Sequence, residues 1–252
     1  MASRDLKIIP VRVTGEIKPG DSLSSKILEA LRHQRTRLQK GDILVVKHKI
    51  VSKAEGRMVE LRSVSPSRSS QKWAERYGLD ARVVQIALSE SKRIVRRKRG
   101  VIITETHHGF VCANSGVDVS NVDGGKHALL LPKDPDRSAM LLHGEIKKFA
   151  RLHIPVIISD SFGRPWREGL TEVAIGLAGM NPLCDYRRKH DAHGYVLHAS
   201  IEAVADELAC AAGLVCGKLE GSPACVIRGF AYQLGPGTAR ELIRPAKNDL
   251  FR

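Results

Sequence analysis

The chain has 252 residues, of which 42% are hydrophobic, and it carries a formal net charge of +14 at pH 7. This length and apolar content exclude a disordered chain and allow one large domain or two interlocked smaller ones. The N-terminus opens into a strand rather than a signal sequence, and there is no run of about 18 apolar residues. We therefore expect a cytoplasmic protein with no membrane partner. The five cysteines are scattered without a C-x-x-C pair, which indicates reduced thiols.

The positive charge favours a polyanionic partner: nucleic acid, nucleotide phosphates or an acidic small molecule. Much of it comes from basic runs within residues 92–99 and 187–190, and such runs are typical of solvated faces or helix ends. Aromatic residues make up 4% of the chain and none lies in these runs, so the stacking platform of a single-strand binder is missing. We expect no nucleic-acid partner. A basic nucleic-acid-binding protein is the alternative from a different functional class.

The first third of the chain alternates strand and helix patterns. Apolar residues predict a strand over 6–13, a helix from Asp21 to Gly41 and a buried strand over 43–46. The basic stretch 47–57 then stands where a loop is expected. It would offer Lys49, Lys53 and Arg57 to phosphates, although neither a P-loop nor a Rossmann glycine motif occurs.

The middle third is predicted to contain three helices and a pair of short strands. The pattern favours helices over 71–77 and 81–94 after a serine-rich connector, paired strands over 101–104 and 109–113, and a helix that starts at 132–135. This last helix leads into an apolar strand over 156–159.

Charged residues follow that apolar strand directly. Asp160 and Ser161, followed by Gly and Pro, predict a sharp exit into a loop at the end of a strand. In open α/β sheets ligands bind beyond the strand ends, and carboxylate and hydroxyl oxygens are ligands that Mg²⁺ prefers. Arg164 and Arg167 would then face anionic groups. In the structural alternative, Asp160 caps a turn and both arginines lie on the surface.

A second polar loop, 114–121, follows a short strand and contains Asp118. Asp118 and Asp160 would converge on one divalent metal, because Mg²⁺ is typically held by one or two carboxylates while phosphates and waters complete its shell. Alone, this loop would also fit a turn with Asn and Asp caps.

The last third contains an apolar, glycine-rich segment at 173–180, where the backbone must approach something closely. A helix over 201–215, a turn over 217–223 and a core strand over 224–227 follow. Alternating strands and helices indicate an α/β protein. No repeat or clean linker divides the chain, so we treat 1–252 as one domain, with two interlocked subdomains as the alternative.

Four blocks of sequence stand out: Ser-Lys-Ala-Glu-Gly-Arg at 52–57, Asn-Ser-Gly-Val-Asp with Ser-Asn-Val at 114–122, Ser-Asp-Ser-Phe-Gly-Arg-Pro-Trp-Arg at 159–167 and Val-Ala-Asp-Glu at 204–207. Together they resemble the coenzyme F420-0 γ-glutamyl ligase family. The resemblance covers nearly the whole chain, in the family's order and spacing. It implies a mixed-sheet α/β fold, an intertwined homodimer, and a GTP-dependent ligase that adds L-glutamate to coenzyme F420-0 through an acyl phosphate.

The same resemblance implies the roles of several residues. Asp118, Asp160 and Ser161 would bind Mg²⁺ or Mn²⁺, as one ion or two. Five residues would contact GTP: Lys49, Lys53, Asn121, Gly217 and Lys218. More loosely, Arg164 and Arg167 would contact the anionic substrate or the incoming glutamate.

This chain departs from the family pattern at several points. Lys218 stands where a relative supplies an acidic metal ligand, so the second metal would be held differently or Lys218 would contact phosphate. Residues 13–17 replace the usual Gly and Pro, which leaves GTP or ATP open. We expect a stand-alone form without a nitroreductase-like domain. His107, His108 and Glu168 are candidates for the base, but none is assigned. A γ-glutamyl ligase for another acidic cofactor, such as a pterin derivative, would keep the same residues.

Overall fold

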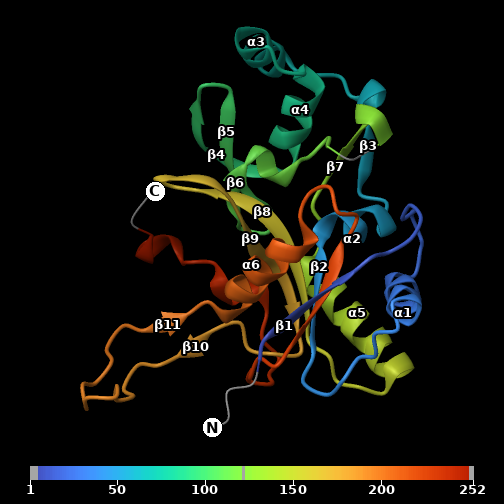
Figure 1. Cartoon of the computed structure of the whole chain (residues 1–252). Helices are drawn as coiled ribbons and strands as arrows, with labels where there is room; N and C mark the ends of the chain where they lie inside the picture. Colours follow the sequence, from blue (N-terminus) through green and yellow to red (C-terminus); the bar gives the residue numbers. More distant parts are fainter. Residues whose placement is uncertain (1–4, 121–122, 250–252) are drawn as a thin grey trace.

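A five-stranded mixed sheet lies at the centre of the computed structural model, which describes residues 5–120 and 123–249 (Figure 1). Neighbouring strands are antiparallel, except that β2 and β8 run parallel. In sheet order the strands are β1 (Lys7–Val11), β12 (Ala224–Arg228), β2 (Ile43–Lys47), β8 (Val156–Arg164) and β9 (Arg167–Ala178). The α/β class predicted from the sequence is confirmed.

Helices cover both faces of this sheet. Because side chains alternate along a strand, Leu44 and Val46 pack on one face, while Ile43 and Val45 pack on the other. The first face is covered by α1 (Leu23–His33) and α5 (Pro135–Ala150), and the second by α6 (Val204–Cys216). The strands read as continuous apolar runs because both of their faces are buried.

Smaller sheets and helices extend from the central sheet. In Figure 1 the upper part contains two helices and the three-stranded sheet, while a long arm that carries β10 and β11 projects at the lower left. These elements are α2 (His48–Ala54), β3 (Met58–Glu60), α3 (Arg68–Tyr77), α4 (Ala81–Ser89), β4 (Ser91–Lys98), β5 (Val101–Thr106), β6 (Val111–Ala113), β7 (His127–Leu129), β10 (Cys184–Asp185) and β11 (Ile201–Glu202).

Five 3-10 helices complete the described elements: η1 (Leu61–Ser63), η2 (Asn114–Gly116), η3 (Asp123–Gly125), η4 (Ala239–Leu242) and η5 (Ala246–Asn248). Within residues 5–120 and 123–249, no helix combines the length and apolar character that crossing a bilayer requires.

Two predicted helices end earlier than the sequence pattern indicated. The first ends at His33 instead of Gly41, and Arg35 just beyond it has a left-handed backbone with φ 53°. The second ends at Ser89, and residues 91–98 form β4, which pairs with β5 instead of extending the helix to 94. The basic run was misread because its charged side chains lie on an exposed edge strand, where charge discourages pairing with other chains.

The predicted loop after residue 159 is also wrong. β8 continues through Arg164 and turns back at Pro165 and Trp166 into β9, which pairs with it along its length. Trp166 adopts φ 56°, the left-handed conformation of a tight turn. Asp160 and Ser161 are therefore consecutive residues of a strand, and a register irregularity lies just before them, between Ile158 and Ser159.

The close backbone approach predicted for residues 173–180 is confirmed at Gly176. A Cβ atom on Gly176 would lie 2.3 Å from the carbonyl oxygen of Pro135, at the start of α5. On the next residue, the N–H of Leu177 donates to Asp136 Oδ1 at 2.9 Å. The N-terminus of α5 therefore rests directly on the backbone of β9.

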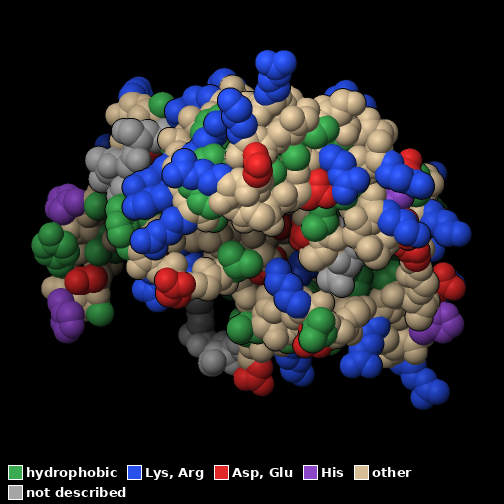
Figure 2. All heavy atoms as spheres, turned by 90° about the horizontal axis from the view of Figure 1, so that it is seen from above, with side chains coloured by type: hydrophobic (Ala, Val, Ile, Leu, Met, Phe, Trp, Pro, Cys, Tyr) green, Lys and Arg blue, Asp and Glu red, His purple; other side chains and the backbone are tan. Residues whose placement is uncertain are grey.

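On the face seen from above, the positive charge is spread out and does not form one stripe (Figure 2). Figure 2 shows Lys and Arg side chains scattered over most of the face seen from above, among neutral and acidic side chains. The two basic runs lie on β4 and on the β10–β11 arm, which are at different ends of the molecule (Figure 1).

Candidate active site

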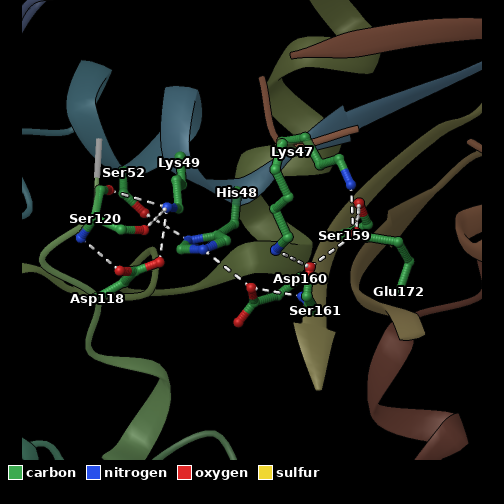
Figure 3. A network of polar contacts seen from close by, with 11 residues as sticks. Lys47, His48, Lys49, Ser52, Asp118, Ser120, Ser159, Asp160, Ser161 and Glu172 are labelled. Carbon is green, nitrogen blue, oxygen red and sulfur yellow. Dashed lines mark hydrogen bonds and ion pairs between the residues drawn. The ribbon is translucent and has the colours of Figure 1, made fainter. Parts of the chain in front are cut away.

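Three consecutive basic side chains at the junction of β2 and α2 point to three different acidic groups. Lys47 ends β2 and precedes the first residue of α2. Lys47 pairs with Glu172, His48 with Asp160 and Lys49 with Asp118 (Figure 3). A helix start spreads successive side chains by about 100° each, which is how one short segment reaches three partners.

The sequence prediction of a loop over 47–57 is therefore wrong for most of that segment. Residues 48–54 form α2, in which Ile50 and Val51 are buried against the core. No Gly or Pro interrupts the segment before Gly56, whose φ of 67° ends the turn. The high charge of this stretch led to the prediction of a loop, although its apolar residues have the spacing of a short amphipathic helix.

The first cluster, here called the aspartate centre, consists of Asp118, Asp160, His48 and Lys49. His48 Nε2 lies 3.2 Å from Asp160 Oδ1, and only 3% of the His48 side chain and 14% of the Asp160 side chain are exposed. The N–H of Ser161 donates to the same Asp160 oxygen at 2.7 Å. One oxygen of Asp160 is thus fixed, while the described residues offer no partner to Oδ2.

Asp118 is held by Lys49 and by its own loop. The Lys49 ammonium lies 2.7 Å from Oδ2, and the N–H of Ser120 donates to Oδ1 at 2.6 Å. Burial raises the pKa of the Asp118 carboxyl, but the Lys49 and Ser120 hydrogen bonds outweigh burial and the net shift is downward. Asp118 is therefore a carboxylate at neutral pH, ready to bind a cation.

The loop before Asp118 turns tightly through three left-handed residues. Asn114, Ser115 and Gly116 have φ of 51°, 56° and 70°, and a Cβ on Gly116 would lie 2.8 Å from Leu131. Ser115 is buried and donates to the carbonyl of Ala87 at 2.6 Å. The predicted turn is present, and it fixes the position of the aspartate that follows it.

The second cluster, here called the glutamate centre, consists of Glu172, Lys47, Ser159, Ser161 and Lys218. Glu172 Oε1 lies 2.5 Å from the Lys47 ammonium and accepts from Ser161 Oγ at 2.7 Å. Its other oxygen accepts from Ser159 Oγ at 2.9 Å. Lys218 Nζ donates to Ser161 Oγ at 2.9 Å.

Glu172 is buried yet ionised. Burial raises the pKa of its carboxyl, but the hydrogen bonds from Lys47 and Ser161 and the Lys47 charge outweigh burial, so the net pKa lies below its usual value. Glu172 packs against Gly213 of α6, where a Cβ would lie 2.7 Å from Glu172 Cγ. A glycine in the helix thus makes room for the glutamate side chain.

The two centres lie on opposite faces of β8. In the β8–β9 register Asp160 is opposite Val173 and Ser161 is opposite Glu172, and neighbouring positions on a strand face opposite sides of the sheet. The three residues predicted as metal ligands are therefore divided: Asp118 and Asp160 lie in the aspartate centre, and Ser161 lies in the glutamate centre (Figure 3).

The two centres differ in how well they suit a divalent metal ion. Among the described residues, no group of three or more His, Cys, Asp or Glu side chains forms a complete metal site. The aspartate centre supplies two carboxylates, which fits Mg²⁺ or Mn²⁺ when phosphate and water complete the shell. The glutamate centre does not fit, because the Lys47 and Lys218 ammonium groups already contact its carboxylate and its Ser161 hydroxyl.

A cavity of about 840 Å³ lies further along β8, and none of the four residues of the aspartate centre lines it. Phe162, two residues after Asp160 and on the same face of β8, lines it, as does Cys112, whose thiol pKa is raised by burial and by the nearby Asp160 charge. Its lining includes aromatic, basic and acidic side chains: Phe110, Phe162, Trp166, Arg96, Arg164, Arg244, Asp206 and Asp249. Another hollow of about 470 Å³, between α1 and the end of α5, contains none of the predicted site residues.

The other predicted site residues lie at varying positions. Lys53 Nζ contacts Glu16 Oε1 at 3.4 Å, Gly217 ends α6 with φ 49°, and Arg164 donates to the carbonyl of Glu168 at 3.1 Å at the hairpin tip. Arg167 is exposed on the same tip. Asn121 lies outside the described residues.

Comparison with known proteins identifies the family. A profile described as F420-0:Gamma-glutamyl ligase matches residues 12–229. The chain belongs to this family. It is 43% identical over 252 residues to "Coenzyme F420:L-glutamate ligase" of Methanopyrus kandleri, covering 98% of both chains. Proteins of the same name from Methanothermobacter thermautotrophicus and Methanocaldococcus jannaschii are 42% and 44% identical, over 98% and 85% of this chain and 99% and 86% of theirs.

Family membership does not by itself reveal the glutamate centre. Lys47 and Glu172 are 125 residues apart and carry no motif that pairs them, so the sequence analysis did not single them out. A usable signal was Glu172, a charged residue that directly precedes the apolar stretch 173–178 of the same strand. A charged residue at a position that faces a helix requires a partner, and the basic residue that ends β2 is one that the sheet order brings close.

Proposed function

We propose that this chain is a GTP-dependent and metal-dependent ligase that joins L-glutamate to coenzyme F420-0, and that it works as a homodimer. Support comes first from its family and from relatives named as ligases of this kind. The single observation that carries the chemical part is the aspartate centre, in which two carboxylates pair with two basic side chains from the start of α2.

The reaction must activate a carboxylate, because an amine does not displace oxide from carbon. A carboxylate oxygen of the acceptor attacks the γ-phosphorus of GTP, the bond to the β-phosphate oxygen breaks and GDP leaves. The amine of glutamate then attacks the acyl carbon, inorganic phosphate leaves, and the nitrogen loses a proton. A divalent ion, when bound, neutralises developing charge on the phosphoryl oxygens.

In this proposal the protein's own residues position the substrates and neutralise their negative charge. Asp118 and Asp160 would hold the ion, and His48 contacts Oδ1 of Asp160, which leaves Oδ2 for the ion. Lys49 is 25% exposed and can turn from Asp118 toward a phosphate once a cation takes its place. Lys53, near the end of α2, and Lys218, in the turn after α6, would add positive charge, which suits a nucleoside triphosphate.

The cavity suits the acceptor. Phe110, Phe162 and Trp166 supply aromatic surface for a planar ring, and Arg96, Arg164 and Arg244 supply positive charge for phosphate and carboxylate groups. Because Phe162 follows Asp160 on one face of β8, an acceptor in the cavity would present its carboxylate toward the aspartate centre.

The test is product mass. Purified protein is incubated with F420-0, L-glutamate, GTP and Mg²⁺ or Mn²⁺, beside Asp118→Asn and Asp160→Asn and a matched control, Asp185→Asn, whose carboxylate pairs with Arg187 on the arm. We expect glutamyl additions from the parent and the control and loss of at least 100-fold in both site variants. Full activity in either site variant would refute the role of the aspartate centre.

Two further arms define the substrates. Replacing GTP by ATP tests the nucleotide, and a pterin bearing a carboxylate tests the acceptor. Product with the pterin alone would transfer the proposal to another acidic cofactor while the phosphoryl chemistry stays the same. Sedimentation equilibrium tests whether the protein is a homodimer. A measured mass equal to that of one protomer would exclude the homodimer.

A further inference from the structure

The glutamate centre contains more positive than negative charge. Glu172 is its one carboxylate among the described residues, and the Lys47 and Lys218 ammonium groups both lie within it. Only 17% of the Lys47 side chain and 9% of the Glu172 side chain are exposed, so water screens these two charges weakly, while Lys218 is exposed. A divalent ion placed here would add two further positive charges to a centre that is already cationic.

The hydrogen bonds of Ser161 decide what the centre can bind. Its hydroxyl proton is directed to Glu172 Oε1 at 2.7 Å, and its oxygen accepts from Lys218 Nζ at 2.9 Å. Lys218 uses one of the two lone pairs of this oxygen, so a metal ion bound to the other would lie directly beside the ammonium charge. The hydroxyl therefore already has a cation as its partner, and that cation is the lysine.

We propose that the Lys218 ammonium serves as the second cation of the active site, so that each site uses one divalent ion, bound at Asp118 and Asp160, and one lysine charge. The two centres can serve one site because β2 pairs with β8 only as far as Ser159, which leaves that edge of β8 open beside Asp160 and Ser161. This inference rests on the proposed function, because it assigns the second cation to the same phosphoryl-transfer site.

The fold explains why Lys218 can reach this position. Helix α6 ends at Cys216, and Gly217 turns the chain with φ 49° and ψ −159°. Lys218 follows at once and spans the distance to β8 with its flexible stem, while Glu220 turns back and accepts the N–H of Leu219 at 2.9 Å. Lys47 keeps Glu172 neutralised, so Lys218 is not consumed by a carboxylate and its charge is available to a phosphate.

The consequence is a site whose second positive charge does not depend on metal concentration. Lysine is a compact point charge with three donors, one of which is directed to Ser161. Two donors remain for phosphoryl oxygens, which is the arrangement that transfer of a phosphoryl group requires.

The experiment counts bound Mn²⁺ by electron paramagnetic resonance, with saturating non-hydrolysable GTP analogue, in the parent protein, Lys218→Glu and Lys218→Met. We expect one ion per chain in the parent and in Lys218→Met, and a second ion in Lys218→Glu, whose carboxylate would join Glu172 and Ser161. Lys189→Glu, on the arm, is the matched control for the change of charge and should keep one ion. Two ions in the parent, or one ion in Lys218→Glu, would overturn the inference.

Product mass in the same samples separates this inference from the proposed function. One Mn²⁺ in the parent and two in Lys218→Glu, with no glutamyl product from F420-0, would leave the lysine assignment standing and reject the substrate. Glutamyl product together with two ions in the parent would do the reverse. We expect Lys218→Met to form product about 100-fold more slowly at every Mn²⁺ concentration, because no ion replaces its charge.

Discussion

The Lys47 ammonium lies 2.5 Å from Glu172 Oε1 and ties the end of β2 to the middle of β9 across the intervening strand β8. Removing one member of a buried ion pair leaves a charge without a partner, and this costs about 3–5 kcal/mol. We expect Lys47→Met to lose stability of this size near neutral pH, measured by urea unfolding. Lys47→Met/Glu172→Gln should recover most of it, because no unpaired charge remains.

The pH dependence of this loss has a definite sign. In the parent the pKa of Glu172 is below its unfolded value of 4.5, so its contribution to stability is present above about pH 4.5 and is lost as pH falls through the folded pKa. In Lys47→Met burial acts without the ammonium and raises that pKa, so the penalty is greatest at neutral pH and shrinks toward pH 4.5. An equal penalty at about pH 7.5 and pH 5 would contradict this account.

Gly176→Ala should destabilise the contact between β9 and α5. The added methyl group would lie 2.3 Å from the Pro135 carbonyl oxygen, so α5 must move, at a cost of about 1–3 kcal/mol. Gly144→Ala within α5 is the matched control, because nothing lies within 4 Å of its Cβ position and alanine favours a helix. Thermal unfolding should rank Gly144→Ala above the parent and Gly176→Ala below it.

Asp136→Asn should be at least as stable as the parent at neutral pH. Asp136 Oδ1 accepts the N–H groups of Leu177 at 2.9 Å and Ala239 at 2.8 Å, and asparagine keeps an acceptor there. Burial raises the pKa of Asp136 despite these two bonds, so the charged form is disfavoured in the folded state. The advantage of asparagine should shrink as pH falls through that raised pKa.

Asp136→Ala is the informative contrast. It leaves two backbone N–H groups without their acceptor, at a cost of about 1–3 kcal/mol for each one that stays buried. Urea unfolding of all three proteins at one pH gives the order. Equal stability of the asparagine and alanine variants would show that the two hydrogen bonds contribute nothing.

Cys112 should resist alkylation in the folded protein. Burial, with the nearby Asp160 charge, raises its thiol pKa to about 12, so the reactive thiolate is scarce at pH 8. Peptide mass mapping after iodoacetamide treatment should find Cys112 unmodified in the native protein and modified in urea. Rapid modification without urea would mean that the cavity lined by Cys112 opens widely in solution.

The sequence was sufficient for what depends on local apolar patterning. The strand at 43–46, the strand at 224–227 and the close approach at Gly176 follow from apolar runs and glycine placement, and the structure contains them. Local patterning failed where tertiary pairing overrides it. The basic residues 91–98 and the polar residues 160–164 form strands because β5 and β9 supply their hydrogen-bond partners.

The sequence likewise predicted only part of the site. Asp118 and Asp160 each come after a run of apolar residues, which the sequence reveals, and both pair with basic residues at the start of α2. The separation of Ser161 from Asp160 required knowing that the segment is a strand and not a loop, because only a strand sends neighbours to opposite sides. The Glu172 partnership depends on sheet order, which a single sequence does not reveal.

Because side chains on β8 alternate between the two faces of the sheet, the number of residues in this strand matters as much as their identity. Deleting or inserting one residue between the irregularity at Ile158 and Phe162 would exchange the two sides, turning Asp160 toward α6 and Ser161 toward α2. Both carboxylate and hydroxyl would still be present in the sequence, yet each would face the wrong partners. The arm between Asp185 and Ile201 has no such parity, so length variation among relatives should accumulate there and stop short of β8.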